Sequence, residues 1–176
     1  MPAAVSTARL TFILLLCLLV RPLAETGFRY QTTDGKLLFQ PAEEFQRTAN
    51  PHAILSLQSR DEVVVLVTSE KRRFDISQIY DGMPSTFDDG SQCLGRVMLS
   101  VDREEAATFL VEGMFPPEEE STHDTVYSVV LRGEIQYTIM IHYPLERGDE
   151  GFEWATDLLR SFSWATPLEK PESVEK

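Results

Sequence analysis

The segment Thr125–Tyr143 reads TVYSVVLRGEIQYTIMIHY and carries the strongest structural signal in the chain. β-Branched and aromatic residues fill two runs, 125–131 and 134–143, and Arg132-Gly133 separates them in the manner of a two-residue turn. Every second residue of the second run is large and apolar or aromatic: Ile135, Tyr137, Ile139, Ile141 and Tyr143. This alternation is typical of a strand with one buried face. The segment therefore predicts a β-hairpin within an antiparallel sheet.

Further runs on the N-terminal side of this hairpin also have the composition of strands. They are residues 28–32, 36–40, 53–58, 62–68 and 94–101. Asp34-Gly35 joins the first two and predicts a second hairpin. The run at 62–68 reads EVVVLVT, and its unbroken β-branched content predicts a central strand buried on both faces.

Three segments have helical patterns. Asp102-Arg103-Glu104-Glu105 has the spacing of a capping box, with Asp102 as the N-cap and Glu105 reaching back to it. The apolar residues that follow share one helical stripe, namely Ala106, Phe109, Leu110, Gly113 and Met114. The pattern thus predicts a helix ending before Pro116-Pro117, a second helix over residues 150–162 and a short one starting at Asp75. Hairpins combined with helices indicate an α+β domain in which helices sandwich an antiparallel sheet.

Two stretches of the C-terminal half resemble a known family. The strand beginning Glu134-Ile135-Gln136-Tyr137-Thr138-Ile139 and the helix closing on Leu158-Leu159-Arg160-Ser161-Phe162-Ser163-Trp164 are similar to the PsbP-like and DcrB-like superfamily of small α+β binding domains. The resemblance covers most of residues 28–164 as an order of elements. It implies an antiparallel sheet sandwiched by helices, and members that mostly bind other proteins. It implies no catalytic residue, and the strong negative charge of this chain sets it apart from the family.

The first 24 residues have the three parts of a secretory signal peptide. Arg9 precedes an apolar run from Leu10 to Val20, and Ala24 follows a helix-breaking Pro22. The run is shorter than the roughly 20 apolar residues that span a bilayer as a helix, although an uncleaved anchor stays an alternative. The sequence thus predicts a signal peptide at 1–24, one domain at 25–166, a polar disordered tail at 167–176 and a periplasmic or secreted location.

Cleavage after Ala24 would remove two arginines and no acid, which leaves 14 basic and 28 acidic residues and a net charge of −14. Such a charge disfavours nucleic acid and anionic membranes and favours a protein partner with a basic surface. Cys93 would then be the only cysteine. A lone thiol in an oxidising compartment is either buried and inert or available for an intermolecular bond.

Two acidic segments are the candidate partner-binding sites, because charged loop residues steer association. The candidate residues are Asp88, Asp89, Glu118, Glu119, Glu120 and Asp124. We expect the segment from Pro117 to Asp124 to be exposed and without regular structure. Calcium binding is the alternative for these oxygens, but neither segment has the alternating Asp-x-Asp-x-Asp-Gly spacing.

No catalytic or cofactor motif is present. The nearest approach to a nucleophile elbow, Asp89-Gly90-Ser91-Gln92-Cys93, lacks its second glycine, and the three histidines stand singly. A small exported hydrolase that uses His142 or His123 with a nearby acid or Cys93 stays open as an alternative. The sequence favours a non-enzymatic binding module without cofactor or metal. The most specific form of this hypothesis is an inhibitor, immunity or chaperone-like partner of a secreted effector.

Overall fold

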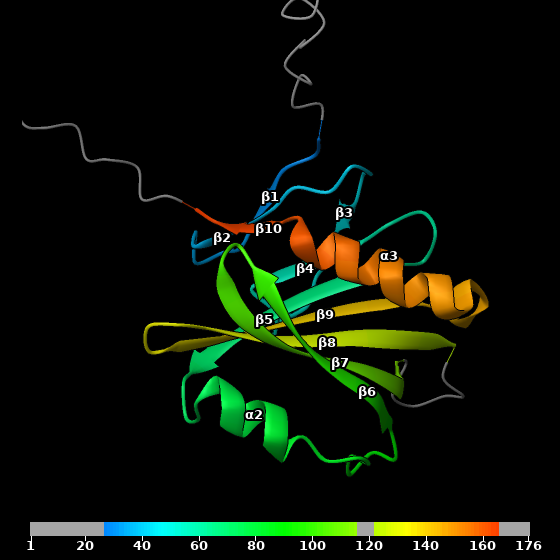
Figure 1. Ribbon diagram of the computed structural model, residues 1–176. Helices are drawn as coiled ribbons and strands as arrows, with labels where there is room; N and C mark the ends of the chain where they lie inside the picture. The colour runs from blue at the N-terminus through cyan, green and yellow to red at the C-terminus, as the bar shows by residue number, and fades with distance from the viewer. Residues whose placement is uncertain (1–26, 116–121, 166–176) are drawn as a thin grey trace, which may run out of the picture.

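A computed structural model of the chain describes residues 27–115 and 122–165. Seven strands form one antiparallel sheet in the order β3-β4-β5-β9-β8-β7-β6, and three short strands form a second sheet in the order β1-β2-β10 (Figure 1). The strands of the large sheet are β3 (Gln46–Arg47), β4 (Leu55–Gln58), β5 (Val64–Lys71), β6 (Gln92–Val101), β7 (Glu104–Phe115), β8 (His123–Arg132) and β9 (Ile135–Pro144). The small sheet contains β1 (Tyr30–Gln31), β2 (Leu37–Phe39) and β10 (Phe162–Trp164).

The hairpin predicted from Thr125–Tyr143 is the centre of the large sheet. β8 and β9 pair along their whole length, from His123 opposite Pro144 to Arg132 opposite Ile135, around the turn at Gly133. Four of the five alternating residues of β9 are at most 1% exposed, and Ile135 is half-buried. The hairpin prediction is therefore confirmed.

One face of the large sheet is closed by α3 (Gly148–Arg160) and the small sheet, which lie together above it in Figure 1. Phe39 of β2 stacks on Phe162 of β10 with ring centroids 4.5 Å apart, and Tyr137 meets Trp164 edge-on at 5.1 Å. Gly151 allows α3 to approach β9 closely, because a Cβ there would lie 2.4 Å from the Tyr143 ring. The predicted helix at 150–162 and the hairpin predicted around Asp34-Gly35 are thus confirmed, and we call this side the α3 face.

The opposite side, which we call the α2 face, is covered only in part, by α2 (Ile76–Gly82). Beneath α2 lies a small buried cluster of Ala107, Phe109 and Val111 from β7. Asp75 is the N-cap of α2, as its sequence position predicted, and its backbone N–H donates to Gln78 Oε1 at 2.9 Å. The side chains of β5 on this face are half-buried or exposed, so the expectation of burial on both faces of that strand is wrong.

The helix predicted after Asp102 is wrong: residues 92–115 form the β6–β7 hairpin. Asp102 and Arg103 form its two-residue turn with φ of 44° and 74°, and two positive φ values define a type I′ turn. Asp102 caps no helix, since its Oδ2 accepts a hydrogen bond from the Trp164 N–H at 2.8 Å. Residues 106–111 of β7 are buried or half-buried on both faces of the sheet, and their sequence AATFLV is therefore largely apolar. Over so short a length, a continuous apolar run also fits the spacing of a buried helix.

The signal peptide at 1–24, the tail at 167–176 and Glu118, Glu119 and Glu120 lie outside the described residues. Within the described parts of the chain, no helix has the length and apolar content needed to cross a membrane.

Candidate functional site

The acidic residues gather at one end of the large sheet, where β5, β6 and β8 begin and β7 and β9 end. We call this the acidic end. Among the described residues its carboxylates include those of Asp61, Glu62, Asp88, Asp89, Glu112, Asp124 and Glu146, together with Glu43 and Glu44 beside Arg60 and Asp61. Arg60 and Arg147 are the described cations that lie among these acids. The connection from Phe115 to His123, which contains Glu118–Glu120 in sequence, leaves and rejoins the sheet at this same end.

The opposite end of the sheet is nearly balanced in charge. Its described cations are Lys71, Arg72, Arg73, Arg103 and Arg132, and its carboxylates are Glu70, Asp75, Asp102, Glu104, Glu105 and Glu134. The side chain of Arg72 forms an ion pair with Asp75. The negative charge of the domain is therefore concentrated at the acidic end.

Asp88 and Asp89 lie exposed in the loop that links α2 to β6. Asp89 organises this loop, because its Oδ1 accepts hydrogen bonds from Ser91 Oγ at 2.6 Å and Ser91 N at 2.9 Å. These bonds to the Ser91 side chain and backbone lower the pKa of Asp89. Asp89 thus has a local structural role, whereas the described structure assigns none to Asp88.

Asp124 does not lie in a loop, which corrects the expectation of irregular structure up to that residue. It is the second residue of β8, half-buried, and pairs with Tyr143 on one side and Glu112 on the other. Burial, and then the neighbouring Glu112 carboxylate, raise the pKa of Asp124. His123 before it is also a strand residue and is buried. The structure therefore brings Asp124 to the same end as Asp88 and Asp89, but as part of the sheet.

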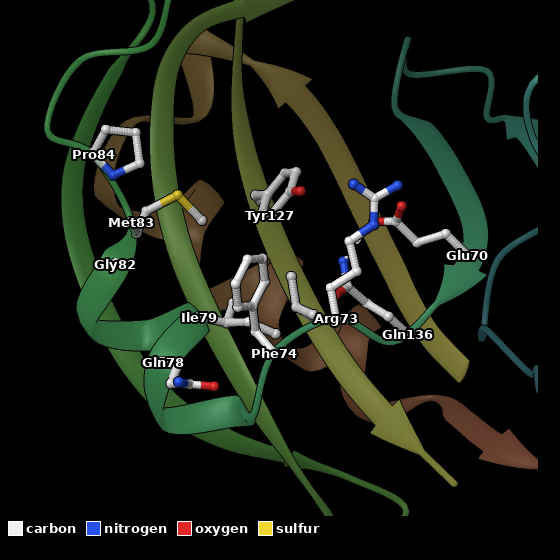
Figure 2. Close-up of a pocket in the computed structure, with 11 residues that line it drawn as sticks. Glu70, Arg73, Phe74, Gln78, Ile79, Gly82, Met83, Pro84, Tyr127 and Gln136 are labelled. Atoms are coloured by element: carbon white, nitrogen blue, oxygen red, sulfur yellow. Dashed lines mark hydrogen bonds between the residues drawn. The ribbon is translucent and has the colours of Figure 1, made fainter. Parts of the chain in front are cut away.

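A groove of about 490 Å³ separates α2 from β8, β9 and β5 on the α2 face (Figure 2). Its apolar surface comes from both the helix and the sheet, from Phe74, Ile79, Met83, Pro84, Tyr127 and Val129. Phe74 stands at the start of α2 with 57% of its surface exposed. The groove can therefore receive an apolar side chain from outside the molecule.

Polar groups line the end of the groove next to β5 and β9. Gln136 Nε2 donates to Glu70 Oε1 at 2.9 Å, and Figure 2 shows the Arg73 guanidinium extending toward Glu70. Burial raises the pKa of Tyr127, with Glu70 adding to the effect and a hydrogen bond to Thr138 opposing it. No described residue that lines the groove is a His, Cys or Ser, so the lining offers hydrogen bonds and apolar contact without a nucleophile and its base.

The histidines suggested for hydrolysis do not meet Cys93. Cys93 on β6 and His142 on β9 are three strands apart in one row of the sheet, at about 4.8 Å per strand. His142 Nδ1 is 2.7 Å from Thr125 Oγ1, and His123 Nε2 is 3.1 Å from the Glu62 carbonyl. Burial, and then the nearby His123, lower the pKa of His142 to about 3. Cys93 therefore does not pair with His123 or with His142.

In the described parts of the chain, no three His, Cys, Asp or Glu side chains lie close enough together to bind a metal ion. Cys93 itself is half-buried with a free thiol, which is less buried than the sequence suggested.

The groove was missed by sequence reasoning. Its residues come from β5, the start and end of α2, β8 and β9, so no single window of sequence contains them. Two signals in the sequence could have suggested the groove. Phe74 is an apolar residue next to a predicted helix start, and Tyr127 lies on the less apolar face of the Thr125–Tyr143 hairpin.

Comparison with known proteins supports the fold. No family model matches the sequence, and no curated protein matches it. The structure is similar to that of cyanobacterial PsbP (CyanoP) from Synechocystis sp. PCC 6803, at a TM-score of 0.59 and 12% identity, over 82% of this chain and 96% of that one. It is also similar to the Ran-binding protein Mog1p of Saccharomyces cerevisiae, at a TM-score of 0.50 and 8% identity, over 78% of this chain and 95% of that one. The PsbP-like fold predicted from the sequence is confirmed.

Proposed function

We propose that this chain is an exported, non-enzymatic module that binds another protein through its acidic end. The observation that carries the proposal is the concentration of carboxylates among the described residues there, against near balance at the other end. A one-sided charge of this kind steers a partner of opposite charge into one orientation. The partner is therefore a protein with a basic surface.

Asp88 and Glu118–Glu120 are the contact residues of this proposal, with Asp89 and Asp124 shaping the surface around them. Asp89 is held by Ser91, and Asp124 is half-buried in β8. Asp88 is exposed and has no such structural role.

A Ran-binding protein among the structures of similar fold is in keeping with a binding role, although the likeness shows the fold alone. The predicted signal peptide supports export to the periplasm or the medium. There, an inhibitor, immunity or chaperone-like protein for a basic secreted effector is the role that we favour.

The test compares two variants of equal charge. The first neutralises the proposed contacts with Asp88→Asn, Glu118→Gln, Glu119→Gln and Glu120→Gln. The matched control neutralises four acids away from both the acidic end and β6, with Glu70→Gln, Glu134→Gln, Glu153→Gln and Asp157→Asn. The purified mature protein is immobilised and exposed to periplasmic extract, and the captured protein is then purified and its association rate is measured against salt concentration.

We expect the first variant to slow association by about tenfold and to flatten its salt dependence, whereas the control retains most of the rate. Equal effects of the two variants would show that only net charge matters and would contradict recognition by the acidic end. Capture of no stoichiometric partner at low or high salt would count against binding as the function.

A further inference from the structure

The edge strand β6 has an open outer side. β6 pairs with β7 from Gln92 to Val101, and on its outer side the bridge from Thr86 to Gln92 and the bond from Cys93 N–H to the Ser85 carbonyl cover its first two residues. Beyond Cys93, no described segment of backbone pairs with this side. Seven of the ten residues of β6 are exposed.

The turn at its end determines which backbone groups point outward. A two-residue turn makes Val101 and Glu104 a hydrogen-bonded pair, and such pairs recur at every second residue. Leu99 and Val97 therefore bond to β7, while Arg96, Met98 and Ser100 direct their N–H and C=O groups away from it. The Tyr80 hydroxyl, 3.5 Å from the Arg96 carbonyl, agrees with this orientation.

Beyond the bulge between Cys93 and Gly95, β6 lacks the features that usually protect an edge strand. Natural edges are short or carry lysine, proline or inward charges. The opposite edge of this sheet, β3, has two residues, whereas β6 has ten, without lysine or proline. Its single charge is Arg96, whose Nη1 donates to the Tyr80 carbonyl at 3.0 Å. Three apolar side chains are exposed along it, with Leu94 at 55%, Met98 at 39% and Val97 at 36%.

We infer that β6 binds an extended segment of the partner protein, which adds an antiparallel or parallel strand to the sheet edge. This inference rests on the proposed function and specifies how the partner is held. The segment has apolar residues at its centre, to cover Val97 and Met98. It has lysine or arginine at both ends, because carboxylates flank both ends of β6. These are Asp88, Asp89 and Glu112 at the start, and Asp102, Glu104 and Glu105 at the end, where the turn also contains the single cation Arg103.

The same charges disfavour a second copy of this chain as the occupant. Two β6 strands paired about a two-fold axis at Met98 would place the start of one beside the end of the other. Asp88 and Asp89 of one copy would then face Asp102 and Glu104 of the other, and like charges across such a contact oppose binding. A basic segment meets opposite charge at both ends instead.

The probe is an eleven-residue peptide of alternating threonine and valine with two lysines at each end. Binding to the mature protein is followed by backbone NMR, and amide exchange is measured at Met98 and Ser100. We expect saturable binding, protection of these two amides, and at least about tenfold weaker binding of a peptide in which glutamates replace the lysines.

Met98→Pro removes an outward N–H without removing a bond to β7, and Met98→Thr is its matched control. We expect the first to weaken peptide binding by about tenfold or more and the second to change it by less than about threefold, with the midpoint of thermal unfolding checked for both. Should Met98→Pro fail to fold, Met98→Lys, which places a charge on the edge, replaces it.

Several results would overturn the inference. They are no protection of Met98 and Ser100 at millimolar peptide, equal binding by the Met98→Pro variant, or a dimer of the free protein that Met98→Pro abolishes. Unchanged peptide binding in that variant together with loss in the Asp88/Glu118–Glu120 variant would leave the acidic-end proposal standing alone. Loss in Met98→Pro with no effect of the acidic variant would support the edge and contradict the acidic contacts.

Discussion

The two faces of the seven-stranded sheet share the same strands but are covered very differently. On the α3 face, Val65, Val67, Ile139 and Ile141 are fully buried under a thirteen-residue helix and the small sheet. On the α2 face, the row Leu66–Met140–Tyr127–Phe109 runs across four strands, and only Phe109, beneath the seven-residue α2, is fully buried. One face stabilises the domain, and the other combines a small cluster with open surface.

This difference shows how the domain can present apolar surface and stay folded. Because the α3 face holds the larger core, residues of the open face can be selected for contact with a partner. The comparison can be tested by changing one face at a time.

The largest expected effect is on the α3 face. Phe39 is fully buried and packs against Phe162 and Phe45, with ring centroids 4.5 Å and 5.4 Å away. Phe39→Ala should lower the free energy of unfolding by about 4 kcal/mol, since the dense core cannot close over the cavity. The matched Phe109→Ala should cost less, about 3 kcal/mol, because half-exposed Tyr80 and Tyr127 around it can relax. Urea denaturation measures both, and a larger loss for Phe109→Ala would reverse the ranking of the two faces.

The second effect concerns acid and the α2 face, where His142 is buried beside Thr125. Its pKa of about 3 in the folded state lies below the ordinary 6.5, because burial and then His123 disfavour the charged form. The unfolded chain therefore binds a proton first as the pH falls below 6.5. The contribution of neutral His142 to the free energy of unfolding is complete above that pH. It is lost as the pH falls toward 3, at up to about 1.4 kcal/mol per pH unit.

Between pH 6.5 and 5 we expect a loss of about 2 kcal/mol, measured by urea denaturation, and a much smaller loss in His142→Gln, which retains a hydrogen-bonding side chain. Asp124 acts in the opposite sense, because a carboxyl whose pKa is raised on folding gains stability as it is protonated. Both proteins share that gain, so the difference between their losses isolates the histidine. The same slope in both proteins would show that His142 is not the titrating group.

Local patterns predicted the elements whose partners are close in sequence. Alternation and Arg132-Gly133 predicted β8 and β9, Asp75 predicted the start of α2, and Phe152 with Leu159 predicted α3. Residues 102–115 were predicted wrongly because Asp102 and Glu105 match a capping box, while the deciding contact, Asp102 to Trp164, spans 62 residues. Distant pairing overrides local propensity at such places.

The candidate site was predicted in composition but not in arrangement. Asp88, Asp89 and Asp124 were chosen as acids, yet their common position at one end follows from the order of strands. The groove and the open edge of β6 also depend on that order, and no residue type in the sequence of β6 predicts that this strand lies at an edge.

The smallest effect on stability should come from Phe74 at the mouth of the groove. With 57% of its surface exposed, Phe74 contributes little to the core, and Phe74→Ser should change the free energy of unfolding by no more than about 0.5 kcal/mol. Ile79→Ser is the control, because Ile79 is half-buried and packs against the cluster around Phe109, and it should cost about 2 kcal/mol.

The same Phe74→Ser variant should bind the captured partner several-fold more weakly if an apolar side chain of the partner occupies the groove, since exposed aromatic residues are frequent anchors. Titration of the partner against both variants, alongside urea denaturation, separates the two readouts. A loss of stability above about 1.5 kcal/mol in Phe74→Ser would place Phe74 in the folding core. The α2 face would then resemble the α3 face, and the division between a stabilising face and an open one would not hold.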